Sequence, residues 1–422
     1  MNLTPISPAM LELGRRARAA ARTLARLPGA ARTRALAAMP AALDAVRAEL
    51  AAANAADVAA AREAGLAGPL LKRLEVTDKV FRYLRDRLAE AAALPDPVGR
   101  VLEGHTRPTG LHVARISVPI GVIGVIFESR PNVTTDAAAV CLKAGNAVIL
   151  RGGSEAVRTN RVLAAAMARA ATAAGLPEHA VQLVDQPGHE SVRDLLRLDG
   201  FIDLLIPRGG KNLIRAVAEG TRIPTLKHYE GVCHLYLAAD APAEMAVALS
   251  VNSKCERVEV CNALEKLLVD AESAPRLLPA LAAAFRERQV ELRGCPRCLA
   301  LCPDGFVPAA ESDWTEEYLA PILAVKVVDG VDAAIDHINS HGSGHTDGIV
   351  TRRLDWADRF VQGVDSASVL VNASTRLSGG GDYGLGAVVG ISTDRLHARG
   401  PVGPEALTTY KWVARGDGHL RG

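Results

Sequence analysis

Helix and strand signals alternate along the middle of the chain, and this alternation limits the possible folds more than any other feature. Residues 120–127 (IGVIGVIF) and 146–150 (NAVIL) are continuously apolar and rich in β-branched residues, as strands buried on both faces are. Amphipathic runs follow them at 134–145 and 155–177. Repetition of this pattern to residue 232, with the last strand expected at 223–229 (IPTLKHY), predicts a mostly parallel, doubly wound sheet, which binds ligands at the carboxyl ends of its strands.

The alternation resumes later in the chain and predicts a second lobe. Strand signals at 324–329, 345–351 and 366–374 alternate with helical signals at 331–342 and 353–364. The predicted fold class is therefore α/β, with two doubly wound lobes.

Composition and charge exclude several classes of protein. The chain has 422 residues, a formal net charge of +2 and 4% aromatic residues, so we expect no nucleic-acid partner. No apolar run reaches the roughly 18 residues of a membrane span. The first 30 residues contain no apolar segment of a secretion signal. The seven cysteines, an odd number in a chain of this size, indicate reduced thiols, so we expect a cytoplasmic protein.

Two glycine pairs follow predicted strands and begin predicted helices. They lie in residues 151–155 (RGGSE) and 207–212 (PRGGKN), and each has a cation beside it, Arg151 or Lys211. Backbone N–H groups at a helix start bind phosphate well. Two such turns on successive strands of one sheet favour a nucleotide site.

Cys261 lies in the stretch RVEVCNALEKLL, residues 257–268. The β-branched residues before it and the helix formers after it predict a strand or turn that leads into a helix. A helix N-terminus favours the thiolate, which is the nucleophilic form of cysteine. The alternative interpretation is a small buried apolar residue, as many free cysteines are.

Two groups resemble metal ligands, but we predict no metal site. Cys295, Cys298 and Cys302 lack a fourth ligand, because the chain has no second C-x-x-C, so a surface loop with incidental thiols is the preferred interpretation. His341 and His345 lack a carboxylate or thiol pair to complete a site, which favours a structural turn.

Five segments of the chain carry a resemblance to a known family. They are VPIGVIGVIFESRPNVTTDAAAVCLKAGNAVILRGGSEA, EVCNALEKLLV, INSHGSGHTDGIVT, VNASTRLSGGG and LHARGPVGPEALTTYKW. Together they resemble the γ-glutamyl phosphate reductases, also called glutamate-5-semialdehyde dehydrogenases, a branch of the aldehyde dehydrogenase superfamily. The resemblance covers essentially the whole chain, in order.

The resemblance implies two lobes of the aldehyde dehydrogenase type and a small β-arm for oligomerisation. The cofactor domain would comprise residues 1–104 and 119–232, and the domain with the catalytic thiol residues 233–395. The arm would comprise residues 105–118 and 396–422, whose strand patterns GLHVARIS and EALTTYKWV need a partner edge. A homodimer or homotetramer is expected.

The resemblance also implies an NADP(H) site. Arg151 falls where the superfamily has a lysine near the adenosine ribose, and Ser154 lies beside it. Gly209 and Gly210 fall at the helix start that faces the cofactor diphosphate. Glu317 falls at the glutamate that holds the nicotinamide ribose.

For catalysis, Cys261 falls at the superfamily nucleophile and Asn132 at the asparagine that stabilises the substrate oxyanion. Arg130, Arg376 and Ser374 are the candidates for binding the anionic substrate. The segment HYEGVCH, residues 228–234, departs from the superfamily's Glu-Leu-Gly-Gly, with Tyr229 in the register of the glutamate that activates water. No general base can be assigned from the sequence.

The implied reaction is NADPH-dependent reduction of L-glutamyl 5-phosphate to L-glutamate 5-semialdehyde and phosphate through a cysteine thioester, in proline biosynthesis. The resemblance also implies functional coupling to glutamate 5-kinase. Two alternatives stay open: an aldehyde-oxidising dehydrogenase, which requires a placed glutamate base, and a scaffold without turnover, which would tolerate a damaged nucleophile segment.

Overall fold

The computed structural model describes residues 5–66, 68–186 and 188–421. The chain divides into two compact units. Unit 1 comprises Met1–Lys227, Gly384–Gly390 and Pro401–Gly422, and unit 2 comprises His228–Tyr383 and Ile391–Gly400.

The boundary between the units differs from the expected one at 232/233. It lies five residues earlier, after Lys227, and the segment Gly384–Gly390 belongs to unit 1. Backbone hydrogen bonds explain this assignment, because Val389 N donates to Val402 O and Val402 N donates to Gly390 O. The segment thereby pairs with the chain that leads into the arm.

The core of unit 1 is a four-stranded parallel sheet in the order β5-β4-β3-β6. Its strands are β3 (Val122–Phe127), β4 (Ala147–Arg151), β5 (Val181–Leu183) and β6 (Leu204–Arg208). Strands β3 and β4 are buried almost throughout, as their apolar runs predict. The order reverses direction between β3 and β6, so the carboxyl ends of these two strands form a topological switch point.

Helices surround this sheet. They are α1 (Pro8–Leu24), α2 (Gly29–Ala45), α3 (Arg47–Glu63), α4 (Gly68–Leu74), α5 (Asp78–Ala93), α6 (Asn132–Lys143), α7 (Val157–Ala173), α8 (His189–Leu195) and α9 (Lys211–Gly220), with a 3-10 turn η1 (Ser154–Ala156) before α7. Helix α2 packs against α5 and α7. Within the described residues, no helix combines the length and apolar character that crossing a membrane requires.

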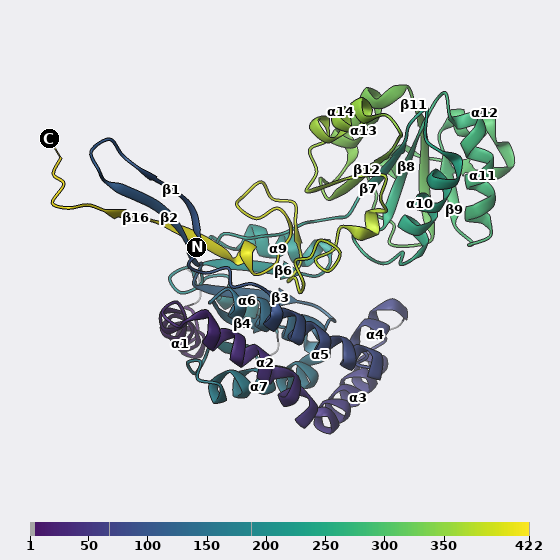
Figure 1. Cartoon of the computed structure of the whole chain (residues 1–422). Helices are drawn as coiled ribbons and strands as arrows, with labels where there is room; N and C mark the ends of the chain where they lie inside the picture. Colours follow the sequence, from purple (N-terminus) through teal and green to yellow (C-terminus); the bar gives the residue numbers. More distant parts are fainter. Residues whose placement is uncertain (1–4, 67, 187, 422) are drawn as a thin grey trace. The chain divides into compact units, whose positions relative to one another are not determined.

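Unit 1 also carries an antiparallel three-stranded arm in the order β1-β2-β16. Its strands are β1 (Val101–Thr106), β2 (His112–Pro119) and β16 (Thr408–Arg415), and they extend away from the rest of the unit as a ribbon (Figure 1). The arm begins four residues earlier than expected, since Val101–Thr106 supplies its first strand. Every residue of β1 is exposed.

Unit 2 is built on a parallel sheet of seven strands in the order β10-β9-β11-β8-β7-β12-β13. The strands are β7 (Cys233–Leu237), β8 (Leu264–Asp270), β9 (Glu291–Gly294), β10 (Val307–Pro308), β11 (Ile322–Val328), β12 (Thr346–Val350) and β13 (Ser368–Val371). Two further strands, β14 (Ile391–Ser392) and β15 (Gly400–Pro401), are hydrogen-bonded to each other and form a separate two-stranded sheet.

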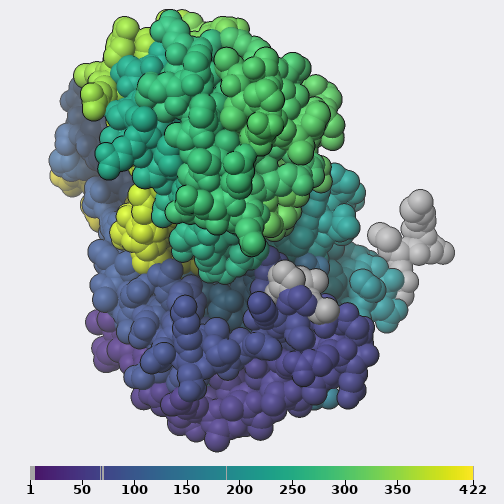
Figure 2. Space-filling model, turned by 90° about the vertical axis from the view of Figure 1, so that its right-hand side faces the viewer, coloured from purple at the N-terminus to yellow at the C-terminus, as the bar shows by residue number. Residues whose placement is uncertain are grey.

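Helices cover both faces of the unit 2 sheet, which explains why its strands are apolar on both sides (Figure 1). Leu235 and Leu267 pack with α10 (Ala243–Cys255), α11 (Ala274–Arg286) and α12 (Pro296–Leu301). Their neighbours Tyr236 and Leu268 pack with α13 (Gly330–His341) and α14 (Leu354–Gly363) on the opposite face. Figure 2 shows, in green, the face of unit 2 on which α11 and α12 lie.

Three local predictions are wrong. Leu264–Asp270 is a fully buried strand, not a helix. Residues 223–229 contain only an isolated bridge from Thr225 to Leu205 in place of the expected strand. Cys295 and Cys298 are buried in the core of unit 2 and are not on a surface loop. Each error has the same cause, because tertiary packing overrides local preference.

Candidate active site

Four segments of unit 2 converge at the amino ends of neighbouring strands. Glu317 precedes β11, Cys261 precedes β8, Gly231 precedes β7 and His345 precedes β12. These strands are adjacent and parallel in the order β11-β8-β7-β12, so their amino ends lie along one edge of the sheet. The edge therefore collects residues from four distant parts of the sequence.

Cys261 lies in a turn between α10 and β8, where Ala263 N donates to Val260 O. The predicted helix start is therefore absent from this described segment. A helix dipole therefore cannot lower the pKa of Cys261, and the groups that do so must be side chains around the thiol.

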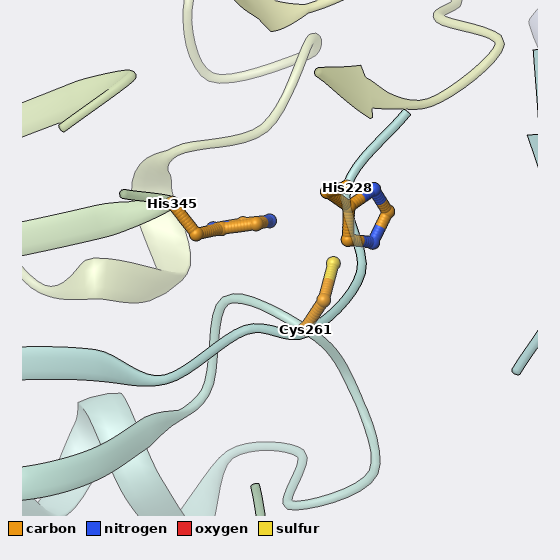
Figure 3. A group of neighbouring side chains, drawn as sticks. All are labelled: His228, Cys261 and His345. Atoms are coloured by element: carbon orange, nitrogen blue, oxygen red, sulfur yellow. The ribbon is translucent and has the colours of Figure 1, made fainter. Parts of the chain in front are cut away.

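Two imidazoles meet the thiol (Figure 3). The ligating atoms of His228, Cys261 and His345 all lie within 4.8 Å of one another. The two rings are 5.3 Å apart between centroids and inclined at 71°. His345 is completely buried, whereas His228 and Cys261 are partly buried.

Hydrogen bonds fix the tautomer of each imidazole. His228 Nδ1 lies 2.9 Å from Ile391 O, which can only accept, so Nδ1 carries the proton. His345 Nδ1 lies 2.9 Å from Thr346 Oγ1, whose own proton goes to Ser378 Oγ and so leaves it to accept from the ring. Ser378 Oγ in turn donates to Thr375 O. Both rings therefore keep an Nε2 lone pair when they are neutral.

These imidazoles decide the ionisation of Cys261. Burial alone raises the pKa of a thiol, but His345, and then His228, outweigh burial and hold the pKa of Cys261 well below its ordinary value. Transfer of the thiol proton to an imidazole gives a thiolate–imidazolium pair. The arrangement can therefore supply a thiolate at neutral pH.

The loop before β7 approaches Cys261 closely through Gly231. A Cβ atom at residue 231 would lie 1.8 Å from Cys261 O, so no larger residue fits there without displacement of the backbone. Gly231 N donates to Glu317 Oε1 at 2.9 Å. Burial raises the pKa of Glu317 to about 7, and the nearby Cys261 thiolate adds to this rise. A carboxyl group with a raised pKa therefore lies near Cys261.

Two predicted substrate residues also lie in unit 2. Arg376 bonds to the Asn262 side-chain oxygen and donates to Glu256 Oε2 at 2.6 Å, so its guanidinium lies next to the residue that follows Cys261. Ser374 is buried, and its hydroxyl lies 3.0 Å from Ser253 Oγ on α10. Substrate binding by either residue stays a prediction.

Asn132 and Arg130 belong to unit 1, at the start of α6. Asn132 Nδ2 donates to Asp136 Oδ2 at 3.0 Å, and burial raises the pKa of Asp136 to about 6. Arg130 O accepts from Val133 N in the first turn. Ser129, just before them, has a φ of 39°, a strained conformation for a residue other than glycine. The roles of Asn132 and Arg130 stay predictions.

The predicted cofactor residues of unit 1 follow β4 and β6. Arg151, at the end of β4, donates to Gly152 O at 2.7 Å and to Gly188 O at 3.0 Å, and burial lowers its pKa. Ser154 is exposed at the start of η1. The residues are thus at the carboxyl edge where such sheets bind ligands.

An acidic side chain already occupies the start of α9. Gly210 N donates to Glu128 Oε2 at 3.0 Å. A Cβ atom on Gly209 would lie 2.4 Å from the same oxygen, so a larger residue there would displace the Glu128 side chain. The site therefore receives an anionic oxygen on its backbone N–H group, as a phosphate-binding helix start does.

The sequence does not indicate that His228 and His345 meet the Cys261 thiol. It predicts a structural turn at His345, and the segment HYEGVCH indicates only that a glutamate base is missing, not a role for His228. In the structure His345 comes directly before β12 and His228 lies five residues before β7, whereas the sequence predicts strands at 345–351 and 223–229 that contain the two histidines. Their contact with Cys261 depends on strand order, which the sequence does not reveal.

Comparison with known proteins adds to this description. The chain matches the aldehyde dehydrogenase family over residues 10–293 and 307–384. It is similar to a γ-glutamyl phosphate reductase from Thermotoga maritima, with 41% identity, a TM-score of 0.95 and coverage of 98% of this chain and 100% of that chain. A γ-glutamyl phosphate reductase from Saccharomyces cerevisiae has 32% identity, a TM-score of 0.55 and coverage of 99% and 100%.

A more distant structure shares the fold. An engineered glycolyl-CoA reductase with bound NADP⁺ has 16% identity, a TM-score of 0.66 and coverage of 96% of each chain. The predicted pair of α/β lobes is thereby confirmed.

Proposed function

The chain belongs to the aldehyde dehydrogenase family, and from this premise we propose that it is a γ-glutamyl phosphate reductase. It reduces L-glutamyl 5-phosphate to L-glutamate 5-semialdehyde and phosphate, a step of proline biosynthesis. The observation that carries the proposal is the Cys261 thiol between two imidazoles, in a chain 41% identical to a reductase of this name.

Acyl transfer to Cys261 follows from the geometry of the site. The thiol proton passes to Nε2 of an imidazole, Sγ bonds to the acyl carbon, and the bond from that carbon to the phosphate oxygen breaks. Phosphate leaves, and a thioester remains on Cys261. Because His345 and His228 stabilise the thiolate, they also make Cys261 a better leaving group when the aldehyde is released.

NADPH, when bound, supplies the hydride that reduces the thioester. The residues proposed to hold it in unit 1 are Arg151, Ser154, Gly209 and Gly210. The Glu128 carboxylate on Gly210 N–H supports this assignment, because its oxygen stands in for a phosphate oxygen at the switch point of the sheet. We propose that Arg151 pairs with the 2′-phosphate that distinguishes NADPH from NADH. Contact of Glu317, in unit 2, with the nicotinamide ribose is a further part of the proposal.

The decisive experiment runs the reaction backwards with glutamate semialdehyde and NADP⁺, and varies inorganic phosphate from absent to excess. If phosphate is the acceptor of the acyl group, NADPH formation requires phosphate or arsenate and saturates with it. Cys261→Ser should abolish turnover, because an alcohol stays protonated near neutral pH, and should leave cofactor binding nearly unchanged. Rapid formation of NADPH and free glutamate without phosphate would instead indicate an aldehyde-oxidising dehydrogenase.

Three broader expectations complete the proposal. We expect a homo-oligomer that forms through the arm, because β1 and β16 are both edge strands. We expect the enzyme to act in the cytoplasm, which agrees with its seven free cysteines. Coupling to glutamate 5-kinase would bring the acyl phosphate directly to the site.

A further inference from the structure

Cys261 and the two histidines beside it, His228 and His345, also form a set of metal ligands. One thiol and two imidazoles lie with their ligating atoms within 4.8 Å of one another, and in the described part of the chain no other group of three or more His, Cys, Asp and Glu residues does so. A thiolate with two neutral imidazoles is a ligand set that zinc prefers. With three protein ligands, a fourth position stays open for water.

The surroundings of the imidazoles match those of zinc ligands. A histidine that binds metal usually donates its other ring N–H to an oxygen, which fixes the ring and its tautomer. His228 does this with Ile391 O, and His345 does it with Thr346 Oγ1. Each ring therefore directs an Nε2 lone pair toward the thiol without further rearrangement of its hydrogen bonds.

The environment of the His345 Nε2 atom agrees with this ligand set. His345 is completely buried, and its Nε2 atom has no hydrogen-bond partner within the described residues. A buried polar atom without a partner is costly and calls for a proton, a thiolate or a bound ion. In Figure 3 the His345 ring points toward the same space as the Cys261 sulfur and the His228 ring.

From these observations we propose that Cys261, His228 and His345 bind Zn²⁺ or a similar borderline divalent cation, and that the bound metal switches the nucleophile off. Coordination forms a metal–sulfur bond and releases one proton from the thiol–imidazole group. The sulfur lone pair needed for attack on an acyl phosphate is then held by the metal. The site does not depend on the identity of the substrate, so it can be tested without turnover.

The main test titrates Co²⁺ alone into the reduced, metal-free full-length chain and records absorption. Wild-type protein should show a thiolate-to-cobalt charge-transfer band and intense visible bands of four-coordinate cobalt, with a stoichiometry of one. Cys261→Ser should remove the charge-transfer band. His228→Ala and His345→Ala should each weaken cobalt binding at least roughly tenfold, since each removes a ligand.

Two control variants distinguish this site from other thiols. Cys255→Ser removes a partly buried cysteine outside the site and should change neither cobalt binding nor activity. Cys298→Ser disrupts a pair of thiols away from the site, in which Cys295 Sγ and Cys298 Sγ are 3.7 Å apart. A charge-transfer band that survives in Cys261→Ser and disappears in Cys298→Ser would overturn the proposal.

A measurement on wild-type protein covers the case in which a histidine variant does not fold. Zn²⁺ should protect Cys261 from iodoacetamide, as read by mass spectrometry of its peptide, and a chelator should restore the reaction. Zn²⁺ should inhibit turnover over the same concentration range. Unchanged alkylation of Cys261 at saturating Zn²⁺ would equally rule the site out, whether or not the protein proves to be a reductase.

Discussion

A buried thiol ionises only where positive charge or hydrogen bonds compensate for the loss of water. At Cys261 two imidazoles provide both, and they come from segments 33 residues before and 84 residues after it (261 − 228 and 345 − 261). Sequence context is sufficient to select Cys261 as the candidate nucleophile. The imidazoles around its thiol could not be predicted, because the expected helix dipole is absent and the histidines reach Cys261 only through the order of the strands.

The ionisation of Cys261 leads to a prediction about pH. Its alkylation by iodoacetamide should follow a titration curve with a midpoint well below that of an ordinary thiol, about 8.5. In His345→Ala the midpoint should rise by roughly 1–3 pH units, because an opposite charge is lost while burial remains. Mass spectrometry of the same samples gives the rate at Cys255, whose pKa burial raises and which should not respond. Equal midpoints in both proteins would show that His345 does not stabilise the thiolate.

Arg151 carries the second prediction at this scale. Arg151→Gln should weaken NADPH binding by about ten- to a hundredfold, the effect of losing one charge-assisted contact of roughly 1.5–3 kcal/mol. NADH, which lacks the 2′-phosphate, should bind nearly as before. Fluorescence titration of both cofactors measures this, with Arg158→Ala as a control because Arg158 pairs with Asp57. An equal loss for NADPH and NADH would refute the assignment.

At the scale of elements, β8 shows where sequence reasoning fails. Its sequence, LEKLLVD, is rich in helix formers, yet all seven residues are buried in the middle of a parallel sheet. The strand tolerates charges because Glu265 pairs with Lys254 of α10 at 3.1 Å, and Lys266 Nζ donates to Glu316 O at 2.6 Å. The sequence of β8 alone does not reveal that Lys254 and Glu316 will pair with its charged residues, so its helix formers predict a helix.

The buried pair of Lys254 and Glu265 should dominate the stability of this region. Both side chains are at most 1% exposed, so Lys254→Met leaves a buried carboxyl group without its partner and should cost about 3–5 kcal/mol. The double variant Lys254→Met/Glu265→Leu should recover much of this loss. Urea unfolding gives the free energies, and Arg257→Ala, which breaks an exposed pair with Glu259, should cost less than about 1 kcal/mol. A single Lys254 variant as stable as wild type would contradict the argument.

The loop before β7 gives a prediction about geometry. Gly231→Ala places a methyl group against the backbone of Cys261 and should lower kcat by about a hundredfold, since small displacements of a nucleophile are costly. Gly200→Ala is the matched control, because a Cβ atom there meets nothing within 4 Å. Steady-state kinetics of both variants measures the difference. Activity of Gly231→Ala close to that of wild type would mean that the loop yields without moving Cys261.

Over the whole molecule, the α/β pattern predicts both sheets, but the position of the candidate site within unit 2 does not follow from it. The carboxyl-end rule agrees with the glycine turns that follow β4 and β6 in unit 1. In unit 2, however, Cys261, His228 and His345 all precede their strands. Sequence order alone cannot reveal this, because strands β7, β8 and β12 become neighbours only through a sheet order of β11-β8-β7-β12.

The arm determines the last prediction, which concerns assembly. On β16, Tyr410 and Trp412 are 48% and 54% exposed, and Arg115 of β2 lies 4.5 Å from the Tyr410 ring. Exposed aromatic residues on an edge strand are typical of a surface that another chain covers. Tyr410→Glu/Trp412→Glu should therefore lower the molar mass in light scattering from a multimer to a monomer, while circular dichroism stays unchanged because neither side chain packs in a core. A multimer of unchanged mass would exclude β16 from the interface.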